Sequence, residues 1–153
     1  MTTYKIPISV LVVIHTPDLQ VLMLERAAHP GFWQSVTGSL NAEDEPLMHT
    51  AIREVREETG LDASAPGHVL RDWKQSSRYD IFYEWKHRFA PGVEQNLEHV
   101  FSLEIPEPVT VTLSAREHIS QMWLPYQEAA AKVFSPTNRD AILDLPQWVS
   151  RSR

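Results

Sequence analysis

Three glutamates lie close together in the stretch REVREETGL, which runs from residue 53 to residue 61. On a helix, Glu57 and Glu58 follow Glu54 by three and four residues, so the three carboxylates would project from one side. Like charges at this spacing repel each other by about a few tenths of a kcal/mol per pair. Hard oxygen ligands at this density suit Mg²⁺, with Mn²⁺ as a substitute. The alternative is a solvated helix face on which pairs such as Arg53 and Glu57 offset the repulsion.

The segment that carries these glutamates has the pattern of an amphipathic helix over residues 46–59. Pro46 suits the first helical position, and Gly60 suits the left-handed position that follows the last turn. Apolar or small side chains recur at helical spacing, and we expect them on the face opposite the glutamates. They are Met48, Ala51, Ile52, Val55 and Thr59.

Short β-branched and apolar segments on both sides of this helix predict strands. We expect strands at 8–16, 21–26, 32–39, 68–75, 79–89, 97–105 and 121–124. The chain from Tyr126 to Trp148 is predicted to be helical, with interruptions at Pro136 and Pro146. Strands with one central helix and C-terminal helices predict an α+β domain layered as an α/β/α sandwich. We expect a single domain over residues 1–153, as its length allows.

The composition excludes several classes of function. The chain has no cysteine, so disulfides, thiolate metal sites and cysteine nucleophiles are excluded. The net charge of −6 argues against nonspecific binding of nucleic acid. The apolar run at residues 8–14 is too short to cross a membrane, and the N-terminus lacks signal-peptide features. We therefore expect a cytoplasmic protein with no membrane or obligate protein partner. His87, His99 and His118 lack zinc-helix spacing and are expected to be structural or surface groups.

The stretch from Gly38 to Leu61 resembles the Nudix box, which is a Gly, a Glu, seven residues and then Arg-Glu-aliphatic-x-Glu-Glu-x-Gly-aliphatic. One departure concerns the loop, which has six residues (39–44) between the glycine and Glu45, where the usual pattern has five. Asp44 would keep that count but would break the seven-residue spacing to Arg53. We prefer Glu45, because the spacing along a helix is rigid and loop length is not. The positions that match are Gly38, Glu45, Arg53, Glu54, Val55, Glu57, Glu58, Gly60 and Leu61.

The resemblance implies a Nudix fold, with a mixed β-sheet and one catalytic helix after the Gly38 loop. Nudix hydrolases cleave a diphosphate linked to another group, and the box glutamates hold divalent cations. By position, Glu54 and Glu58 would be the main metal ligands, and Glu57 would be a further ligand or the general base. Arg53 would orient a glutamate through a charge-assisted hydrogen bond. Glu45 would support the loop and the start of the helix.

Within this family, five segments resemble the group that hydrolyses dihydroneopterin triphosphate in bacterial folate biosynthesis. They are YKIPISVLVVI, VLMLER, FWQSVTGS, HRFAPGVEQNLEHVFSLEIP, and REHISQMWL with the later SPTNRDAI. This likeness implies Mg²⁺-dependent release of pyrophosphate, which leaves dihydroneopterin monophosphate. Two alternatives remain open. One is a house-cleaning hydrolase of (deoxy)nucleoside triphosphates, and the other is a Nudix-fold binding module without catalysis.

Five further residues are candidates for the metal and phosphate end of the site. The resemblance places Glu117 beside the metal, where it would complete the ligand set; the alternative is an ordinary loop glutamate. Lys5 and Arg26 would receive phosphate charge, for which arginine is well suited, or they are solvated cations at strand ends. Thr37 and Gly38 would present a hydroxyl and backbone groups to the substrate, or they form a plain turn.

The pterin ring is expected to contact residues 79–82, which we predict to begin a strand. An aromatic ring for stacking and a carboxylate that accepts N–H bonds suit a pterin, and Tyr79, Asp80, Ile81 and Phe82 offer both. Alternation along a strand would send Tyr79 and Ile81 to one face and the other two to the opposite face. Core packing is the alternative for the three apolar residues. Ser135 would bond the ligand or would cap a helix that begins at Pro136.

Overall fold

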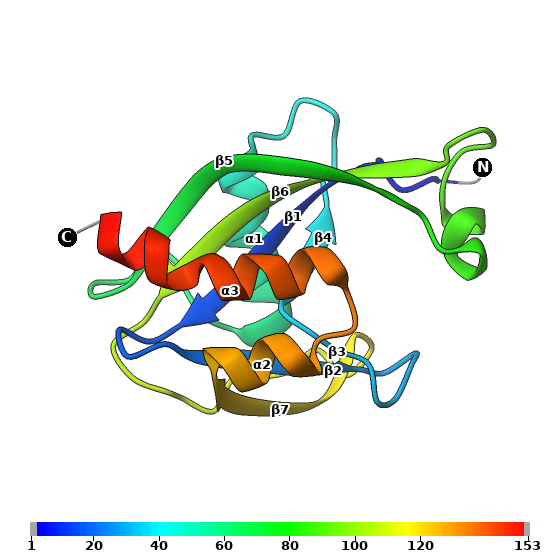
Figure 1. Ribbon diagram of the computed structural model, residues 1–153. Coiled ribbons are helices and arrows are strands. Elements are labelled where there is room, and N and C mark those ends of the chain that lie inside the picture. The colour runs from blue at the N-terminus through cyan, green and yellow to red at the C-terminus, as the bar shows by residue number, and fades with distance from the viewer. Residues whose placement is uncertain (1–2, 152–153) are drawn as a thin grey trace.

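The computed structural model describes residues 3–151, so residues 1, 2, 152 and 153 of the expected single domain lie outside the described part. The strands are β1 (Ile8–His15), β2 (Gln20–Arg26), β3 (Trp33–Gln34), β4 (Val36–Ser39), β5 (Val69–Asp80), β6 (Gln95–Glu104) and β7 (His118–Pro125). The helices are α1 (Leu47–Thr59), the 3₁₀ helix η1 (Tyr83–Arg88), α2 (Tyr126–Lys132) and α3 (Pro136–Arg151). Figure 1 shows their arrangement.

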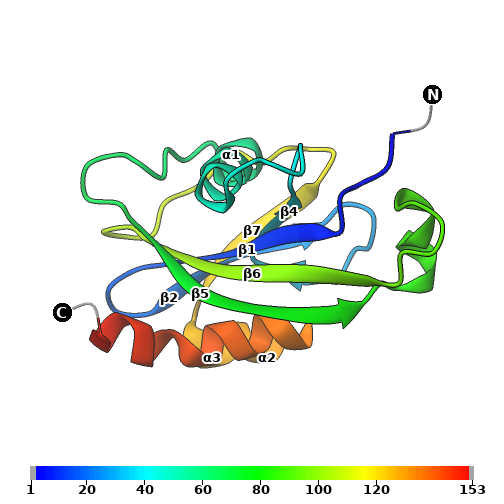
Figure 2. The same ribbon diagram turned by 90° about the horizontal axis from the view of Figure 1, so that it is seen from above.

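The strands form one mixed sheet with helices on both faces. Its main strand order is β3-β2-β1-β6-β5, while β4 pairs with β1 and β7 pairs with β2. β1 is parallel to β6, and its partners β2 and β4 are antiparallel to it. Viewed from above, α1 covers one face of the sheet, and α2 and α3 cover the other (Figure 2). The predicted α+β sandwich with a mixed sheet is therefore confirmed.

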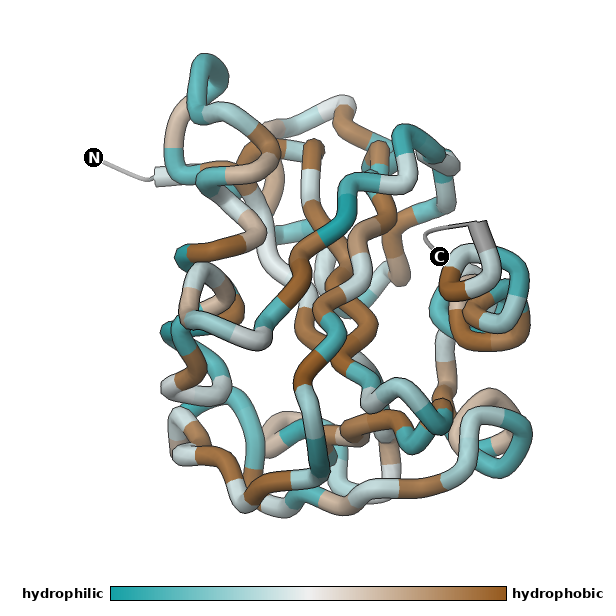
Figure 3. The backbone as a smooth tube through the Cα atoms, turned by 90° about the vertical axis from the view of Figure 1, so that its left-hand side faces the viewer, coloured by the Kyte–Doolittle hydropathy of each residue, from teal (hydrophilic) through white to brown (hydrophobic). Residues whose placement is uncertain are grey.

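The central strand β1 supplies side chains to a hydrophobic core on each side of the sheet. Val10, Val12 and Ile14 pack toward α1, whereas Leu11 and Val13 pack toward α2 and α3. Alternation along a strand buried on both faces explains why its sequence is a continuous apolar run. The hydropathy colouring in Figure 3 shows many hydrophobic residues along the central strands.

Helix α1 follows the predicted bounds closely. Gly60 adopts the left-handed conformation with φ of 75°, and its N–H donates to the carbonyl of Arg56. Ala51, Val55 and Thr59 are buried as expected, but Met48 is exposed, which corrects its assignment to the buried face. Leu47, the residue before Met48, packs against the core instead, so the buried face of the helix runs through Leu47, Ala51 and Val55. No helix within residues 3–151 has the length and apolar character that a membrane span requires.

The predicted strands at 68–75 and 79–89 are wrong in their division. A single strand, β5, runs from Val69 to Asp80 across a register shift between Asp72 and Ser76. Residues 83–88 form the 3₁₀ helix η1, not a strand. The aromatic residues of this segment favoured a strand by composition, but β-propensity largely reflects packing opportunity. Here Phe82 and Trp85 pack against Phe134, and the N–H of Ile81 bonds the carbonyl of Glu94 as the chain turns back.

Two smaller differences concern the segments around β3 and α3. The predicted strand 32–39 is divided at Ser35, whose N–H donates to Oδ1 of Asn138. Pro136 begins α3 as expected, but Pro146 lies inside that helix and does not end it. An internal proline costs about 3 kcal/mol. Burial of Ile142 and Leu145 against the sheet offsets this cost.

Candidate active site

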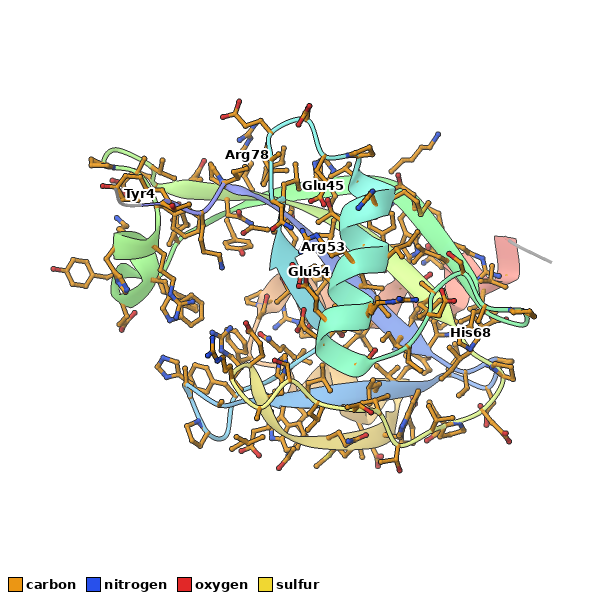
Figure 4. The ribbon with its side chains drawn as sticks, turned by 180° about the vertical axis from the view of Figure 1, so that it is seen from behind. Tyr4, Glu45, Arg53, Glu54, His68 and Arg78 are labelled. Carbon is orange, nitrogen blue, oxygen red and sulfur yellow. The ribbon has the colours of Figure 1, made fainter. Side chains whose placement is uncertain are left out.

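Helix α1 lies against strand β4 at Gly38, where the lack of a side chain leaves room for a residue of the helix. Gly38 pairs with Val10 of β1, and a Cβ atom built on Gly38 would lie 2.0 Å from Cδ of Glu54. The missing side chain therefore makes room for the Glu54 carboxylate beside the strand. Figure 4 shows Arg53 and Glu54 on the side of α1 that faces β4, with Glu45 nearer the start of the helix.

Arg53 joins the box glutamates to one another and to the preceding loop. Its Nη2 and Nε donate to the two carboxylate oxygens of Glu45 at 2.9 and 3.0 Å. Its Nη1 donates to Glu54 at 2.8 Å and lies 3.3 Å from an oxygen of Glu57, while Nη2 also donates to the Ser39 carbonyl. This arginine thus offsets part of the repulsion between the carboxylates. The alternative interpretation of the helix as a solvated face had assigned this role to ion pairs such as Arg53 and Glu57.

Glu45, and not its neighbour Asp44, is the carboxylate of the loop that Arg53 holds. The Glu45 carboxylate also accepts bonds from the N–H of Asn41 and from the Thr50 hydroxyl. These bonds, Arg53 first, lower the pKa of Glu45 to about 2. Asp44 is exposed. The six-residue loop therefore closes around Glu45 and places it one helical turn before Thr50.

The three glutamates do not share one solvated face, which corrects the sequence-based expectation. The Glu57 side chain is 55% exposed, whereas Glu58 is a buried residue at 3%. Neither carboxylate oxygen of Glu58 has a hydrogen-bond partner of normal geometry. Burial raises the pKa of Glu58 well above its ordinary value, and the neighbouring Glu54 raises it further. Glu58 is therefore a buried acid with no partner of its own that could balance its charge.

A buried histidine lies next to Glu58, and it does not supply that balancing charge. Nδ1 of His118 is 3.6 Å from Glu58, and its Nε2 bonds the Gln34 amide at 3.0 Å. Gln34 in turn accepts a bond from Arg26. Burial, with a smaller contribution from Arg26, lowers the pKa of His118 to about 4, so its ring is neutral at pH 7. The expectation that His118 is structural agrees with this position.

The donor set around Glu58 fits a hard divalent cation. Two orphaned carboxylate oxygens are buried beside a second carboxylate, that of Glu54. Glu117 is close enough to raise the pKa of Glu58 as well. Oxygen-only ligands of this kind suit Mg²⁺ or Mn²⁺. Among the described residues, no three acidic or histidine side chains are already gathered as a complete ligand set.

A cavity of about 340 Å³ adjoins this cluster, between the sheet and the start of α3. It reaches β4 at Gly38, where Glu54 lies behind the strand. The structure brings Glu117 and all the predicted substrate-binding residues into its lining. Those residues are Lys5, Arg26, Thr37, Gly38, Tyr79, Asp80, Ile81, Phe82 and Ser135.

The basic residues of the cavity lie near the acidic cluster. Arg88, which the sequence analysis missed, lines the cavity with Lys5 and Arg26. The N–H of Lys5 donates to the Arg88 carbonyl, and the Arg26 guanidinium lies 4.5 Å above the ring of Trp85. Partial burial and the neighbouring Arg88 lower the pKa of Arg26. Cations close to carboxylates suit a ligand that carries phosphate together with a divalent metal.

Of the four candidates for the pterin ring, Tyr79 and Asp80 end strand β5 and Ile81 and Phe82 follow it, so no strand begins at residue 79. Tyr79 is half-buried and its hydroxyl accepts a bond from Asn96, whereas Asp80 is exposed and accepts a bond from Gln95. Ile81 is buried, and Phe82 is exposed beside Trp85 and Phe134. Because the strand ends at Asp80, the alternation expected for 79–82 does not apply beyond that residue.

Ser135 both lines the cavity and caps a helix. Its Oγ accepts a bond from the N–H of Asn138 and bonds the Thr137 hydroxyl, in the first turn of α3. The helix-capping alternative is thus seen directly. Asn138 also lines the cavity and bonds Ser35 twice across the fold. This pair ties the start of α3 to the junction of β3 and β4.

Several lining residues had no signal strong enough for sequence analysis to find them. Gln34, Trp85 and Asn138 come from three separate segments, and their contacts span long separations in the chain. Asn96 and Glu98 offered a weak signal, since polar residues at alternate positions of a strand share one face. Their position in the cavity depends on how β6 pairs with β1 and β5.

Comparison with known proteins agrees with this architecture. A family model described as the NUDIX domain matches residues 5–145. The chain is 43% identical over 140 residues to the dihydroneopterin triphosphate diphosphatase of Escherichia coli K12, covering 91% of each chain. It is 39% identical to the Haemophilus influenzae protein of the same name, covering 93% of this chain and 89% of that one.

A solved structure extends the likeness to three dimensions. The structure of the E. coli dihydroneopterin triphosphate pyrophosphohydrolase superposes with a TM-score of 0.85 at 42% identity. The match covers 92% of this chain and 95% of that chain. The family model spans most of the chain, α1 carries most of the box, and the mixed sheet lies between helices. This chain therefore belongs to the NUDIX domain family.

Proposed function

We propose that the protein hydrolyses dihydroneopterin triphosphate to dihydroneopterin monophosphate and pyrophosphate, with Mg²⁺ as its cofactor. The observation that carries the proposal is the cavity, because the predicted substrate residues meet there beside Glu54 and the orphaned Glu58. The fold alone would name a chemistry and not a substrate. The names of the E. coli and H. influenzae relatives, which are similar over most of the chain, support the substrate.

In this proposal, Glu54 and Glu58 hold the metal, and Glu117 completes the ligand set. Mg²⁺ is the expected ion, and Mn²⁺ would substitute for it. When bound, the ion neutralises phosphate charge and lowers the pKa of an attacking water. Glu57 serves as a further ligand or as the general base. Its exposed carboxylate is free to meet solvent, from which the attacking water comes.

The remaining roles are positioning roles. Arg53 holds Glu54 through its 2.8 Å hydrogen bond and is itself held by Glu45. Lys5 and Arg26 receive the phosphates, and Gly38 allows close approach beside Thr37. The partner is a small molecule; a cytoplasmic location and the lack of a nucleic-acid or obligate protein partner stay predictions from the sequence.

Part of the cavity lining is aromatic and suits a flat heterocycle. Phe82, Trp85 and Phe134 form a cluster with ring centroids 5.0 to 6.3 Å apart, and the Arg26 guanidinium lies 4.5 Å from the centre of the Trp85 ring. Aromatic faces stack well on planar bases. Tyr79, Ile81 and Ser135 line the same cavity, and Ser135 offers a hydroxyl to a ligand.

The test is the release of pyrophosphate, with and without Mg²⁺, from dihydroneopterin triphosphate and from a panel of nucleoside triphosphates. Metal-dependent release with the highest kcat/KM for the pterin substrate supports the proposal. Release from nucleotides alone keeps the chemistry and replaces the substrate, giving a house-cleaning hydrolase. Binding without turnover of any substrate would indicate a noncatalytic Nudix module.

A further inference from the structure

Two buried polar side chains on β6 line the cavity without taking part in the acidic cluster. Asn96 and Glu98 are alternate residues of the strand, so they share the face that is opposite α1. They are 2% and 4% exposed, and both belong to the cavity lining. Val100, next on the same face, packs in the core beneath α2 and α3. The polar pair therefore lies where the hydrophobic core gives way to the cavity.

The Asn96 side chain is held so that it offers an acceptor. Its Nδ2 donates to the Ser9 hydroxyl at 2.7 Å and to the Tyr79 hydroxyl at 3.1 Å. Both amide hydrogens are thus used, whereas Oδ1 has no partner. A buried acceptor left without a donor costs about 1–3 kcal/mol. The cavity therefore lacks a donor at this position.

Glu98 presents a second acceptor with the same lack. Its Oε1 has no hydrogen-bond partner, and within residues 3–150 no lysine or arginine forms an ion pair with it. The nearby Thr137 hydroxyl offsets part of the burial that raises the pKa of Glu98. A buried carboxylate is normally paired with a cation or with hydrogen-bond donors. Two unsatisfied acceptors on one wall suggest a ligand edge that is rich in N–H donors.

We infer that Glu98, assisted by the Oδ1 of Asn96, binds the 2-amino-4-oxo pyrimidine edge that pterins and guanine share. On that edge the ring N3–H and the exocyclic 2-amino group point the same way, so one carboxylate accepts from both. The second amino hydrogen is available to Asn96. This inference rests on the proposed function, and it names the residues that select the ring. It also replaces Asp80, whose exposed carboxylate is engaged by Gln95.

The placement leaves the other end of the cavity to the phosphates. Lys5 and Arg26 both lie within electrostatic range of Glu117, and Arg26 lies within range of Glu58 as well. Glu98 shares a face of β6 with Val100, which packs on the side of the sheet opposite α1. A ligand with its donor edge on β6 would extend its phosphates past β4 toward the acidic cluster.

A matched pair of nucleotides tests the inference, because dGTP and dITP differ only in the 2-amino group. For the wild-type protein with Mg²⁺, kcat/KM for dGTP should exceed that for dITP by about 10-fold to 100-fold, as expected for a hydrogen bond to a charged group. Glu98→Gln puts an amide donor where the ligand also donates. In this variant the ratio should fall to near one, mainly through KM, and kcat/KM for dihydroneopterin triphosphate should fall by a similar factor. The ratio of kcat/KM for dihydroneopterin triphosphate and dGTP shows which source of this edge is preferred.

Controls separate ring recognition from general damage. Glu128→Gln changes an exposed glutamate on α2 and should leave every ratio at its wild-type value. Glu98→Asp keeps the charge but withdraws it by one methylene, and it too should reduce the dGTP preference. The second readout is calorimetric binding of the product dihydroneopterin monophosphate, which needs no turnover and should weaken about 10-fold or more in Glu98→Gln.

The outcomes distinguish this inference from the proposed function. If dihydroneopterin triphosphate is hydrolysed but Glu98→Gln keeps the wild-type dGTP to dITP ratio and product affinity, ring recognition by Glu98 is wrong and the reaction stands. If the wild-type protein hydrolyses no substrate, the proposed reaction fails, and the calorimetric comparison still decides the role of Glu98. Equal product affinity in the wild-type protein and Glu98→Gln would then overturn the inference.

Discussion

The ion pair between Glu45 and Arg53 should contribute a measurable, pH-dependent part of the stability. Their two hydrogen bonds of 2.9 and 3.0 Å are the largest cause of the fall in the pKa of Glu45 from 4.5 to about 2. Each pKa unit corresponds to about 1.4 kcal/mol, so ionised Glu45 stabilises the fold by roughly 3 kcal/mol. The Glu45 side chain is only 10% exposed, so solvent screens the pair weakly. We expect Glu45→Gln to lower the free energy of unfolding by about 2 kcal/mol at pH 7, because glutamine keeps some of the hydrogen bonds.

The pH dependence follows from the direction of the shift. A carboxyl group whose pKa is depressed in the folded state stabilises the fold above its unfolded pKa, about 4.5, and loses that contribution as the pH falls toward 2. The difference between wild type and Glu45→Gln should therefore be constant from pH 7 to pH 5 and should shrink to about half by pH 3. Urea unfolding at these pH values, with EDTA present so that no metal contributes, measures it.

Asp44→Asn is the matched control for this experiment. Asp44 is the exposed neighbour on the same loop, and Arg53 bonds Glu45 instead. The control should change the free energy of unfolding by less than about 0.5 kcal/mol. The reasoning would be refuted if Glu45→Gln were as stable as wild type at pH 7, or if its deficit were the same at pH 7 and pH 3.

Three further outcomes are expected. Gly38→Ala should place Cβ against the Glu54 carboxylate, which is the end of a flexible side chain and can move, so the melting temperature should change little. The displaced carboxylate should lower kcat by about 10-fold to 100-fold. Wild-type activity in this variant would show that Glu54 need not lie there. Glu58→Gln should reduce kcat/KM by about 100-fold or more, and wild-type turnover would contradict the metal site. Without metal, the variant should be no less stable than wild type above neutral pH. The reason is that the pKa of Glu58 is raised in the folded state, so ionised Glu58 destabilises the fold as the pH rises. Mg²⁺ at 100 times its dissociation constant should add about 2.7 kcal/mol to the free energy of unfolding of wild type and much less to that of Glu58→Gln, as titration followed by thermal melting would reveal.

The sequence predicted those helices and strands whose determining residues lie within a few positions of one another. The helix at 46–59 was found because apolar spacing, Pro46 and Gly60 all act within a few residues, and the structure gives Leu47–Thr59. The strands at 8–16 and 21–26 were found for the same reason. The strand predicted at 79–89 failed because its aromatic residues pack on Phe134, which is distant in the sequence. Pro146 was misjudged because tertiary burial of its helix outweighs a local cost.

The burial of individual carboxylates was beyond any pattern in the sequence. Helical spacing places Glu57 and Glu58 next to each other, yet one is exposed and the other is enclosed beside His118. The difference arises because β7 brings His118 over the end of α1, a contact between segments 60 residues apart. For the same reason the sequence analysis offered Asp80 as the carboxylate that faces the ring. The pairing of β6 with β1 and β5 brings Glu98 into the lining of the same cavity, which no local pattern indicated.

By itself, the sequence determined which residue types could perform chemistry and how they are spaced along one helix. That information is local, because a helix converts separations of three and four residues into a shared side without help from the rest of the chain. Only the tertiary structure decided which carboxylates lose water and which stay solvated. Desolvation depends on what packs over a side chain, and the partners of Glu58 and Glu98 come from strands and helices far away in the sequence. Because desolvation sets both the pKa of a carboxylate and its need for a partner, the difference between buried acids such as Glu58 and Glu98 and exposed acids such as Glu57 emerges only in the folded chain.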